Sequence, residues 1–158
     1  MKQIIQAFID ADKVAIAGAS PNKDNFGKTL MTEIAKLGKM IYLVNPLYKE
    51  IDGRSCLQSV KDLPGDVESL ILVVPPEVSE VIAYQCVESG IKRVWMVRGI
   101  GKGAYSEKAH ATLSENQIDV VYGFCPMMFY GKGLHSFHLW LRKTFGKLPG
   151  EYQLSPEE

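Results

Sequence analysis

The chain has 158 residues, 46% of them hydrophobic and 23% charged, which is the composition of one folded globular domain and excludes a disordered chain. Lys plus Arg and Asp plus Glu each total 18, so the formal net charge is zero, and the class of basic proteins that coat nucleic acid is excluded. Neither a membrane span nor a signal peptide is expected, because no apolar run approaches ~20 residues and acids interrupt the opening MKQIIQAFIDADK.

Five short apolar runs, rich in β-branched residues, alternate with amphipathic stretches. They cover residues 14–19, 40–45, 69–75, 93–97 and 119–122. Such runs are typical of strands buried on both faces, as parallel sheets require. The alternation predicts an α/β fold, a three-layer, Rossmann-like doubly wound parallel sheet of about five to six strands with right-handed crossovers.

Helical periodicity fills the intervals. The expected helices lie near Ile4–Ile9, at Leu30, Ile34 and Leu37 with a stop at Gly38, at Val78, Val81, Ile82 and Gln85, over 106–116, and from Leu134 to Phe145. A short strand is expected near Ser55 and Cys56, followed by a helical turn before Pro64. We expect one domain over 1–149 and a polar, frayed tail over 150–158.

The ten-residue loop from Gly18 to Gly27 is the first candidate site. A glycine at a strand end allows unusual dihedral angles, and the N-terminus of the next helix offers free N–H groups that suit phosphate. Ser20, Asn25 and Lys28 could add donors. The alternative is a plain strand-to-helix connection. The loop has neither the Gly-x-Gly-x-x-Gly dinucleotide fingerprint nor a P-loop.

Further candidates follow the other strands, because ligands of open parallel sheets bind beyond the carboxyl ends of the strands. The second run ends in Asn45-Pro46, where an NAD site would favour an acid. Pro75 and Pro76 form either a rigid rim for a flat base or a proline-initiated helix. The segment from Arg98 through Gly99 to Gly103 is either a phosphate contact or a flexible loop.

The cysteines and histidines carry the catalytic alternative. Cys125 would need a base or a positive environment to act as a nucleophile, and a buried structural role is the alternative. His110, His135 and His138 are the histidines, and the last two share a helix face without enough ligands for a metal site. The three cysteines are an odd number far apart, which fits a reducing cytoplasm rather than a disulfide framework.

Five segments in order resemble the small, free-standing CoA-binding proteins, which are similar to the CoA-binding domain of the succinyl-CoA synthetase α subunit and of ADP-forming acyl-CoA synthetases. The segments are VAIAGAS, LVNP, LILVVPPEV, ESGIKRVWMV and VVYGFCP. The resemblance covers Ile9 to Pro126. It departs at Arg98, where many small members carry an acid or glutamine.

The resemblance implies coenzyme A, or acyl-CoA, as the ligand and assigns roles to residues. Phosphates would be held by Gly18, Ala19, Ser20, Asn25, Phe26 and Gly27, and by Asn45 and Pro46 with Lys49 as the cation. Val74, Pro75 and Pro76 would line the adenine side. Because the second, catalytic domain of the synthetases is not matched, ligase activity is not carried over.

Three functions follow. The first is a non-catalytic CoA-binding module or accessory protein, which would act as a homo-oligomer or beside a partner subunit. The second is an NAD(P)-binding oxidoreductase or redox sensor on the same fold. The third is an acyl-CoA-handling enzyme that uses Cys125 or a histidine. In all three the partner is a small nucleotide, with no nucleic acid and no membrane.

Overall fold

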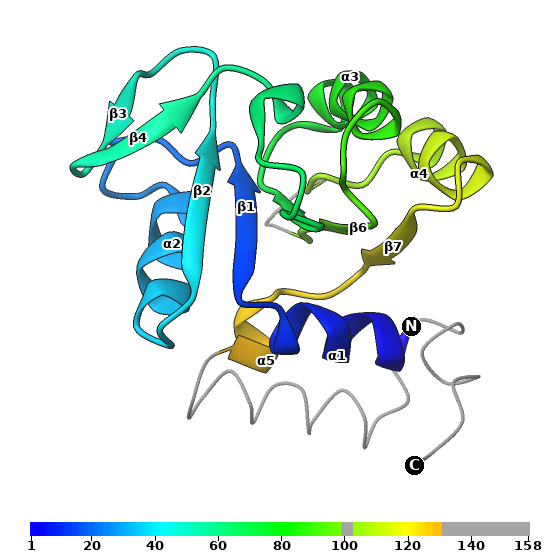
Figure 1. Ribbon diagram of the computed structural model, residues 1–158, viewed down its shortest axis with the longest axis horizontal. Helices are drawn as coiled ribbons and strands as arrows, with labels where there is room; N and C mark the ends of the chain where they lie inside the picture. Colours follow the sequence, from blue (N-terminus) through cyan, green and yellow to red (C-terminus); the bar gives the residue numbers. More distant parts are fainter. Residues whose placement is uncertain (99–102, 131–158) are drawn as a thin grey trace.

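The computed structural model describes residues 1–98 and 103–130. Seven strands form one sheet in the order β3-β4-β2-β1-β5-β6-β7 (Figure 1). They are β1 Lys13–Ala17, β2 Met40–Val44, β3 Glu50–Ile51, β4 Arg54–Leu57, β5 Ser69–Leu72, β6 Arg93–Met96 and β7 Asp119–Tyr122. Every neighbouring pair is parallel except β3 with β4. The predicted α/β sheet is confirmed, and β3 adds a two-residue antiparallel edge strand beyond the five to six expected.

Helices cover both faces of this sheet. They are α1 Lys2–Asp10, α2 Phe26–Ala35, the 3-10 turn η1 Val60–Asp62, α3 Pro76–Val87, α4 Glu107–Glu115 and α5 Met127–Tyr130. One buried cluster joins α1, α2 and α5 to the sheet, and a second joins α3 and α4 to the opposite face. In Figure 1, α1 and α5 accordingly lie on the other side of the sheet from α3 and α4. The result is the three-layer arrangement that the alternating pattern predicted.

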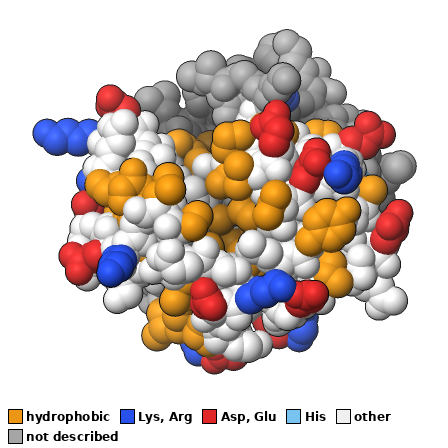
Figure 2. Space-filling view, turned by 90° about the horizontal axis from the view of Figure 1, so that it is seen from above, with side chains coloured by type: hydrophobic (Ala, Val, Ile, Leu, Met, Phe, Trp, Pro, Cys, Tyr) orange, Lys and Arg blue, Asp and Glu red, His pale blue; other side chains and the backbone are white. Residues whose placement is uncertain are grey.

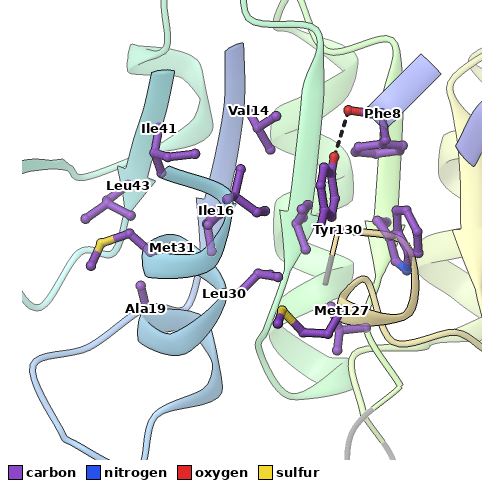
Figure 3. Close-up of a cluster of buried hydrophobic side chains, with 14 of the residues drawn as sticks. Phe8, Val14, Ile16, Ala19, Leu30, Met31, Ile41, Leu43, Met127 and Tyr130 are labelled. Atoms are coloured by element: carbon purple, nitrogen blue, oxygen red, sulfur yellow. Dashed lines mark hydrogen bonds between the residues drawn. The ribbon is translucent and has the colours of Figure 1, made fainter. Parts of the chain in front are cut away.

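The first cluster holds the amino-terminal helix and α5 together, as Figure 3 shows. The rings of Phe8 and Trp95 meet edge to face with centroids 5.3 Å apart, a favoured aromatic geometry. The Tyr130 hydroxyl donates to the Phe8 carbonyl at 2.7 Å (Figure 3). These contacts join α1 to β6, which carries Trp95, and to α5.

Two helix predictions need correction. The prediction that Val78 and Val81 face the core is wrong, because they are 42% and 59% exposed. The helix begins at Pro76, and the stripe it turns to the sheet falls instead on Ser79, Ile82, Ala83 and Cys86. Leu37 lies beyond the end of α2 and is 46% exposed. The stop at Gly38 is confirmed by its positive φ of 79°.

The other secondary-structure predictions are confirmed where the chain is described. A short strand and a helical turn occupy Arg54–Leu57 and Val60–Asp62. The fourth predicted helix is α4, capped by Ser106. The expected C-terminal helix from Leu134 and the tail from 150 lie outside the described residues. Within 1–98 and 103–130, no helix is long and apolar enough to cross a membrane.

Candidate functional site

Gly18 lets the chain leave β1 close to the neighbouring strand. Its φ is +97°, and a Cβ built there would lie 2.1 Å from the Val73 carbonyl oxygen. Its N–H donates to the Val44 carbonyl at 3.2 Å. Only glycine satisfies both the dihedral angle and the space. The loop after β1 is therefore pressed between the ends of β2 and β5.

Asn25 organises the rest of that loop. It is the N-cap of α2, and its Oδ1 accepts from the backbone N–H of Lys28 at 2.9 Å and of Ser20 at 3.1 Å. Its Nδ2 donates to the Gly18 carbonyl at 3.3 Å. Asparagine is among the best N-cap residues because its oxygen satisfies a donor that the helix leaves free. One side chain thus ties both ends of the loop to the helix start.

The start of α2 keeps two donors available. The first four N–H groups of a helix have no intrahelical acceptor. The Asn25 N–H donates to the Asn22 carbonyl, and the Lys28 N–H donates to the Asn25 Oδ1. Among the described residues, the N–H groups of Phe26 and Gly27 are then without a partner. They lie at the positive end of a ten-residue helix, an arrangement suited to phosphate oxygens.

Gly27 brings this helix start against the loop. A Cβ at Gly27 would lie 2.8 Å from Cα of Ala19, which is fully buried. Any larger residue would push the helix away from the loop. The close approach keeps the N–H groups of the first helical turn beside the segment Gly18–Ala19.

Lys28 supplies the cation nearest the helix start. Its ammonium pairs with the Asp52 carboxylate at 2.9 Å and donates to the Pro21 carbonyl at 3.3 Å. Asp52 sits in the turn between β3 and β4 with φ +50°. The predicted cation is therefore present, but in this structure its charge is shared with an acid that the sequence analysis did not single out.

Asn45, at the end of β2, is occupied by its neighbours. Its Nδ2 donates to the Ala19 carbonyl at 2.8 Å, and its Oδ1 accepts from the Leu47 N–H at 3.0 Å. An acid that holds ribose hydroxyls in NAD sites would need a free carboxylate at this place. The amide instead joins the β2 loop to the β1 loop.

Val73, Val74 and Pro75 form a ridge between two hollows at the carboxyl end of the sheet. All three residues line both hollows. Figure 2 looks onto the end toward which β1 and β2 point, and shows hydrophobic side chains near the middle of this face with charged ones around them. The ridge is rigid because Pro75 fixes its own φ and caps α3.

The smaller hollow has a volume of about 430 Å³. It lies over the ends of β1 and β2 and is walled by α3. It is lined by Ala17, Gly18, Val44, Asn45, Pro46, Leu47, Gln58, Val73, Val74, Pro75, Val78, Val81, Ile82 and Gln85. None of these side chains is charged. The exposure of Val78 and Val81 is explained here, because they form an open apolar wall.

The larger cavity has a volume of about 770 Å³. Its lining residues are Asp24, Phe26, Val73, Val74, Pro75, Val97, Arg98, Gly103, Ala104 and Cys125. Burial raises the pKa of the Cys125 thiol, and the nearby backbone N–H groups of Met127 and Met128 only partly offset that rise. A thiol in this state is a poor nucleophile at neutral pH. Among the described residues, the lining of this cavity is therefore largely apolar, with Asp24 and Arg98 as its charged side chains.

The predicted site residues largely converge on this edge. Gly18, Asn45 and Pro46 line the smaller hollow, Phe26 and Arg98 line the larger, and Val74 and Pro75 line both. Ala19, Ser20, Asn25, Gly27 and Lys28 form the loop and helix start beside them. Pro76 begins α3 just behind the ridge, and Lys49 is exposed but lines neither hollow. Gly99 lies outside the described residues.

His110, the histidine within the described residues, lines neither hollow. His110 packs against the rings of Tyr105 and Tyr122, whose centroids lie 6.0 and 5.2 Å from its own. His135 and His138 lie outside the described residues. Sequence reasoning missed Asp24, Asp52, Gln58 and Gln85 as site residues. The place of the two glutamines at the hollow depends on how α3 packs against η1, which the sequence pattern does not contain.

Comparison with known proteins identifies the family. The family described as "CoA binding domain" matches residues 12–131. The chain belongs to this family. The match confirms the resemblance and, at the level of the family, the prediction that coenzyme A is the ligand.

Individual relatives agree. The chain is 30% identical over 138 residues to an ADP-forming acetate–CoA ligase of Methanocaldococcus jannaschii, covering 85% of this chain and 19% of the relative. It resembles a conserved hypothetical protein of Pyrococcus furiosus with a TM-score of 0.66 and 35% identity, covering 73% of this chain and 97% of that one. It also resembles a hypothetical protein of Pyrococcus horikoshii with a TM-score of 0.72 and 29% identity, covering 80% of this chain and 86% of that one.

The coverage separates two kinds of relative. The chain spans about a fifth, or less, of the length of the curated ligases it matches. It spans most of the small structural relatives. The shared unit is therefore the CoA-binding domain and not a whole ligase.

Proposed function

We propose that this protein binds coenzyme A or an acyl-CoA at the carboxyl end of its sheet as a non-catalytic binding module. The observation that carries the proposal is a pair of hollows that share the wall of Val73–Pro75, the larger of which reaches Phe26 at a helix start where two N–H donors have no partner among the described residues. Coenzyme A has a flat base, a diphosphate and a long flexible arm. The smaller hollow, the helix start and the larger cavity offer a place for each.

The phosphates would lie on the loop between β1 and α2. Gly18, Gly27 and Ala19 supply close backbone approach, and the Phe26 and Gly27 N–H groups supply donors. Ser20 and Lys28 stand beside them, and Asn25 holds the loop in shape. The Asn45 amide is already bonded to neighbouring backbone groups. It therefore suits a structural role in a CoA site better than contact with the ribose of NAD.

The base and the arm would lie on opposite sides of the ridge. The uncharged smaller hollow, with Pro46, Val74 and Pro75 in its wall, suits adenine. The larger cavity, with Phe26 and Arg98 in its lining, suits the pantetheine arm and its thiol or thioester. Lys49, assigned by resemblance, lines neither hollow and remains a proposed phosphate contact. Gly99, assigned from the glycine-rich segment after β6, lies outside the described residues and also remains a proposed contact.

A binding role fits the chemistry better than acyl transfer by Cys125. The raised pKa of this thiol argues against a resting thiolate, which such an enzyme would require. Three free thiols also suit a reducing compartment, so we place the protein in the cytoplasm. Since a relative from Pyrococcus furiosus is named as a subunit α of a ligase, an accessory role beside a partner subunit or a second copy is consistent with the module.

Thermal melting with CoA, acetyl-CoA, ADP, NAD and NADPH tests the proposal. A ligand at 100 times its dissociation constant adds about 2.7 kcal/mol, which is a shift of roughly 5 to 11 °C for a domain of this size. We expect such a shift with CoA and acetyl-CoA and none with NAD. A shift with NAD alone would overturn the proposal. Acetyl-CoA should also stay intact on prolonged incubation, and its hydrolysis would contradict the non-catalytic role.

A further inference from the structure

The smaller hollow contains two glutamine side chains whose amide orientation is fixed by backbone groups. The Oε1 of Gln85 accepts from the Val60 N–H at 3.3 Å. The Nε2 of Gln58 donates to the Tyr48 carbonyl at 3.3 Å. A backbone N–H can only donate and a carbonyl can only accept, so neither amide can be turned over without losing its bond.

The opposite half of each amide is left for a ligand. Among the described residues, the Nε2 of Gln85 and the Oε1 of Gln58 have no hydrogen-bond partner. The hollow thus offers the Gln85 Nε2 as a donor and the Gln58 Oε1 as an acceptor, in a lining whose described side chains are uncharged and whose third amide, Asn45, is already bonded to backbone groups. A flat heteroaromatic ring with an acceptor beside a donor on its edge complements this set.

We propose that Gln85 and Gln58 read the Watson–Crick edge of adenine, so that they determine base specificity at this site. The Gln85 Nε2 donates to N1 of the base, and the Gln58 Oε1 accepts from the 6-amino group. Val78 and Val81 cover the ring face. The inference rests on the proposed function, since it assumes that the nucleotide of coenzyme A enters this hollow.

Replacing the 6-amino group by a carbonyl oxygen reverses both halves of the edge. The deaminated base carries an N–H at N1 and an acceptor at position 6. It would set donor against donor at Gln85 and acceptor against acceptor at Gln58. The wild-type protein is therefore expected to bind CoA at least about tenfold more tightly than deamino-CoA.

The decisive variant is Gln85→Glu. Its carboxylate keeps an oxygen for the Val60 N–H, so the fold is retained, but it places an acceptor where the ligand needs a donor. Gln58→Glu is the charge-matched control: it gives up the bond to the Tyr48 carbonyl, but it adds the same charge to the same hollow and still offers an acceptor to the 6-amino group. Calorimetric titration of both variants with CoA, deamino-CoA and base-free 4′-phosphopantetheine measures the effect, with thermal melting as the check on folding.

We expect Gln85→Glu to shift the ratio of the CoA and deamino-CoA affinities toward deamino-CoA by about tenfold or more, while Gln58→Glu leaves that ratio close to wild type. Affinity for 4′-phosphopantetheine should change equally in the two variants. An unchanged ratio in Gln85→Glu, with CoA still bound by the wild type, would overturn the base-reading role alone. If the wild type binds neither CoA nor deamino-CoA, the proposed function itself fails.

Discussion

The two hollows beside the Val73–Pro75 ridge share a wall but differ in chemistry. The described residues that line the smaller hollow include no charged side chain, and its glutamine amides are oriented by backbone bonds. The larger carries Asp24 and Arg98 in its lining together with a half-buried thiol. Because of this difference, the smaller hollow suits a neutral ring held in one orientation. The larger cavity suits the pantetheine arm, whose end is a thiol or a thioester. The loop between β1 and α2 serves both sides, because it contributes Gly18 to one and Phe26 to the other.

The largest expected effect comes from adding a side chain at Gly18, where the loop after β1 passes close to Val73. Gly18→Ala places a Cβ against the Val73 carbonyl and a side chain at positive φ. We expect unfolding free energy to fall by ~3 kcal/mol or more, because strain and overpacking add, and CoA binding to be lost. Gly38→Ala is the control, since it has a similar φ with nothing within 4 Å. It should cost only about 1–2 kcal/mol and leave CoA affinity intact. If urea unfolding gives the same loss of unfolding free energy in Gly18→Ala and Gly38→Ala, the close approach at Gly18 is not the cause.

The next effect tests whether the shared loop acts on the ligand or only on the fold. Asn25→Ala removes an N-cap and should lower the unfolding free energy by about 1–2 kcal/mol. It should also weaken CoA binding about tenfold, because the loop loses three hydrogen bonds. Ser106→Ala removes the cap of α4. It should reduce stability comparably without changing CoA affinity, and a matching loss of affinity would show that general destabilisation is the cause.

The first of these tests concerns a feature that the sequence predicted well. The strand runs and Gly18 are local signals, since a few neighbouring residues determine them. Asn25 was predicted as a donor to the ligand, and the structure uses it as the cap of α2. Gln85 and Val81 were expected on the core face of their helix. Their real place depends on how α3 lies against β2 and η1, which is a tertiary property that periodicity does not contain. The two-residue strand β3 was missed because it is too short to show alternation, and with it Asp52, the partner of Lys28.

A third prediction concerns the larger cavity alone. Burial raises the pKa of Cys125, so little thiolate is present at pH 7 and alkylation should be slow, becoming faster only as the pH rises above the ordinary thiol range. Bound CoA should slow it several-fold further by covering the cavity. Mass spectrometry of iodoacetamide labelling would measure the rate at each cysteine, with Cys86, on the far side of α3 from solvent, as the reference. Rapid labelling at pH 7 that CoA does not affect would place the arm elsewhere.

The smallest effect concerns the charge at the helix start. Asp52→Asn releases the Lys28 ammonium from its ion pair and should tighten CoA binding about two- to threefold at low salt. Lys28→Met should weaken it by a similar factor, because exposed pairs and contacts of this kind are worth only ~0.2–1 kcal/mol. Titration at two salt concentrations checks both. Weaker binding in Asp52→Asn would mean that the acid helps to hold Lys28 in place for the ligand.

The most direct test of the account is a backbone amide NMR titration with CoA. If the phosphates rest on the start of α2, the Phe26 and Gly27 amide resonances should shift downfield as they gain acceptors, and residues lining both hollows should shift with them. Amides at the opposite end of the sheet, such as that of Lys92, should stay unchanged. Saturable CoA binding that leaves the Phe26 and Gly27 amides unmoved would contradict the central claim that this helix start holds the nucleotide.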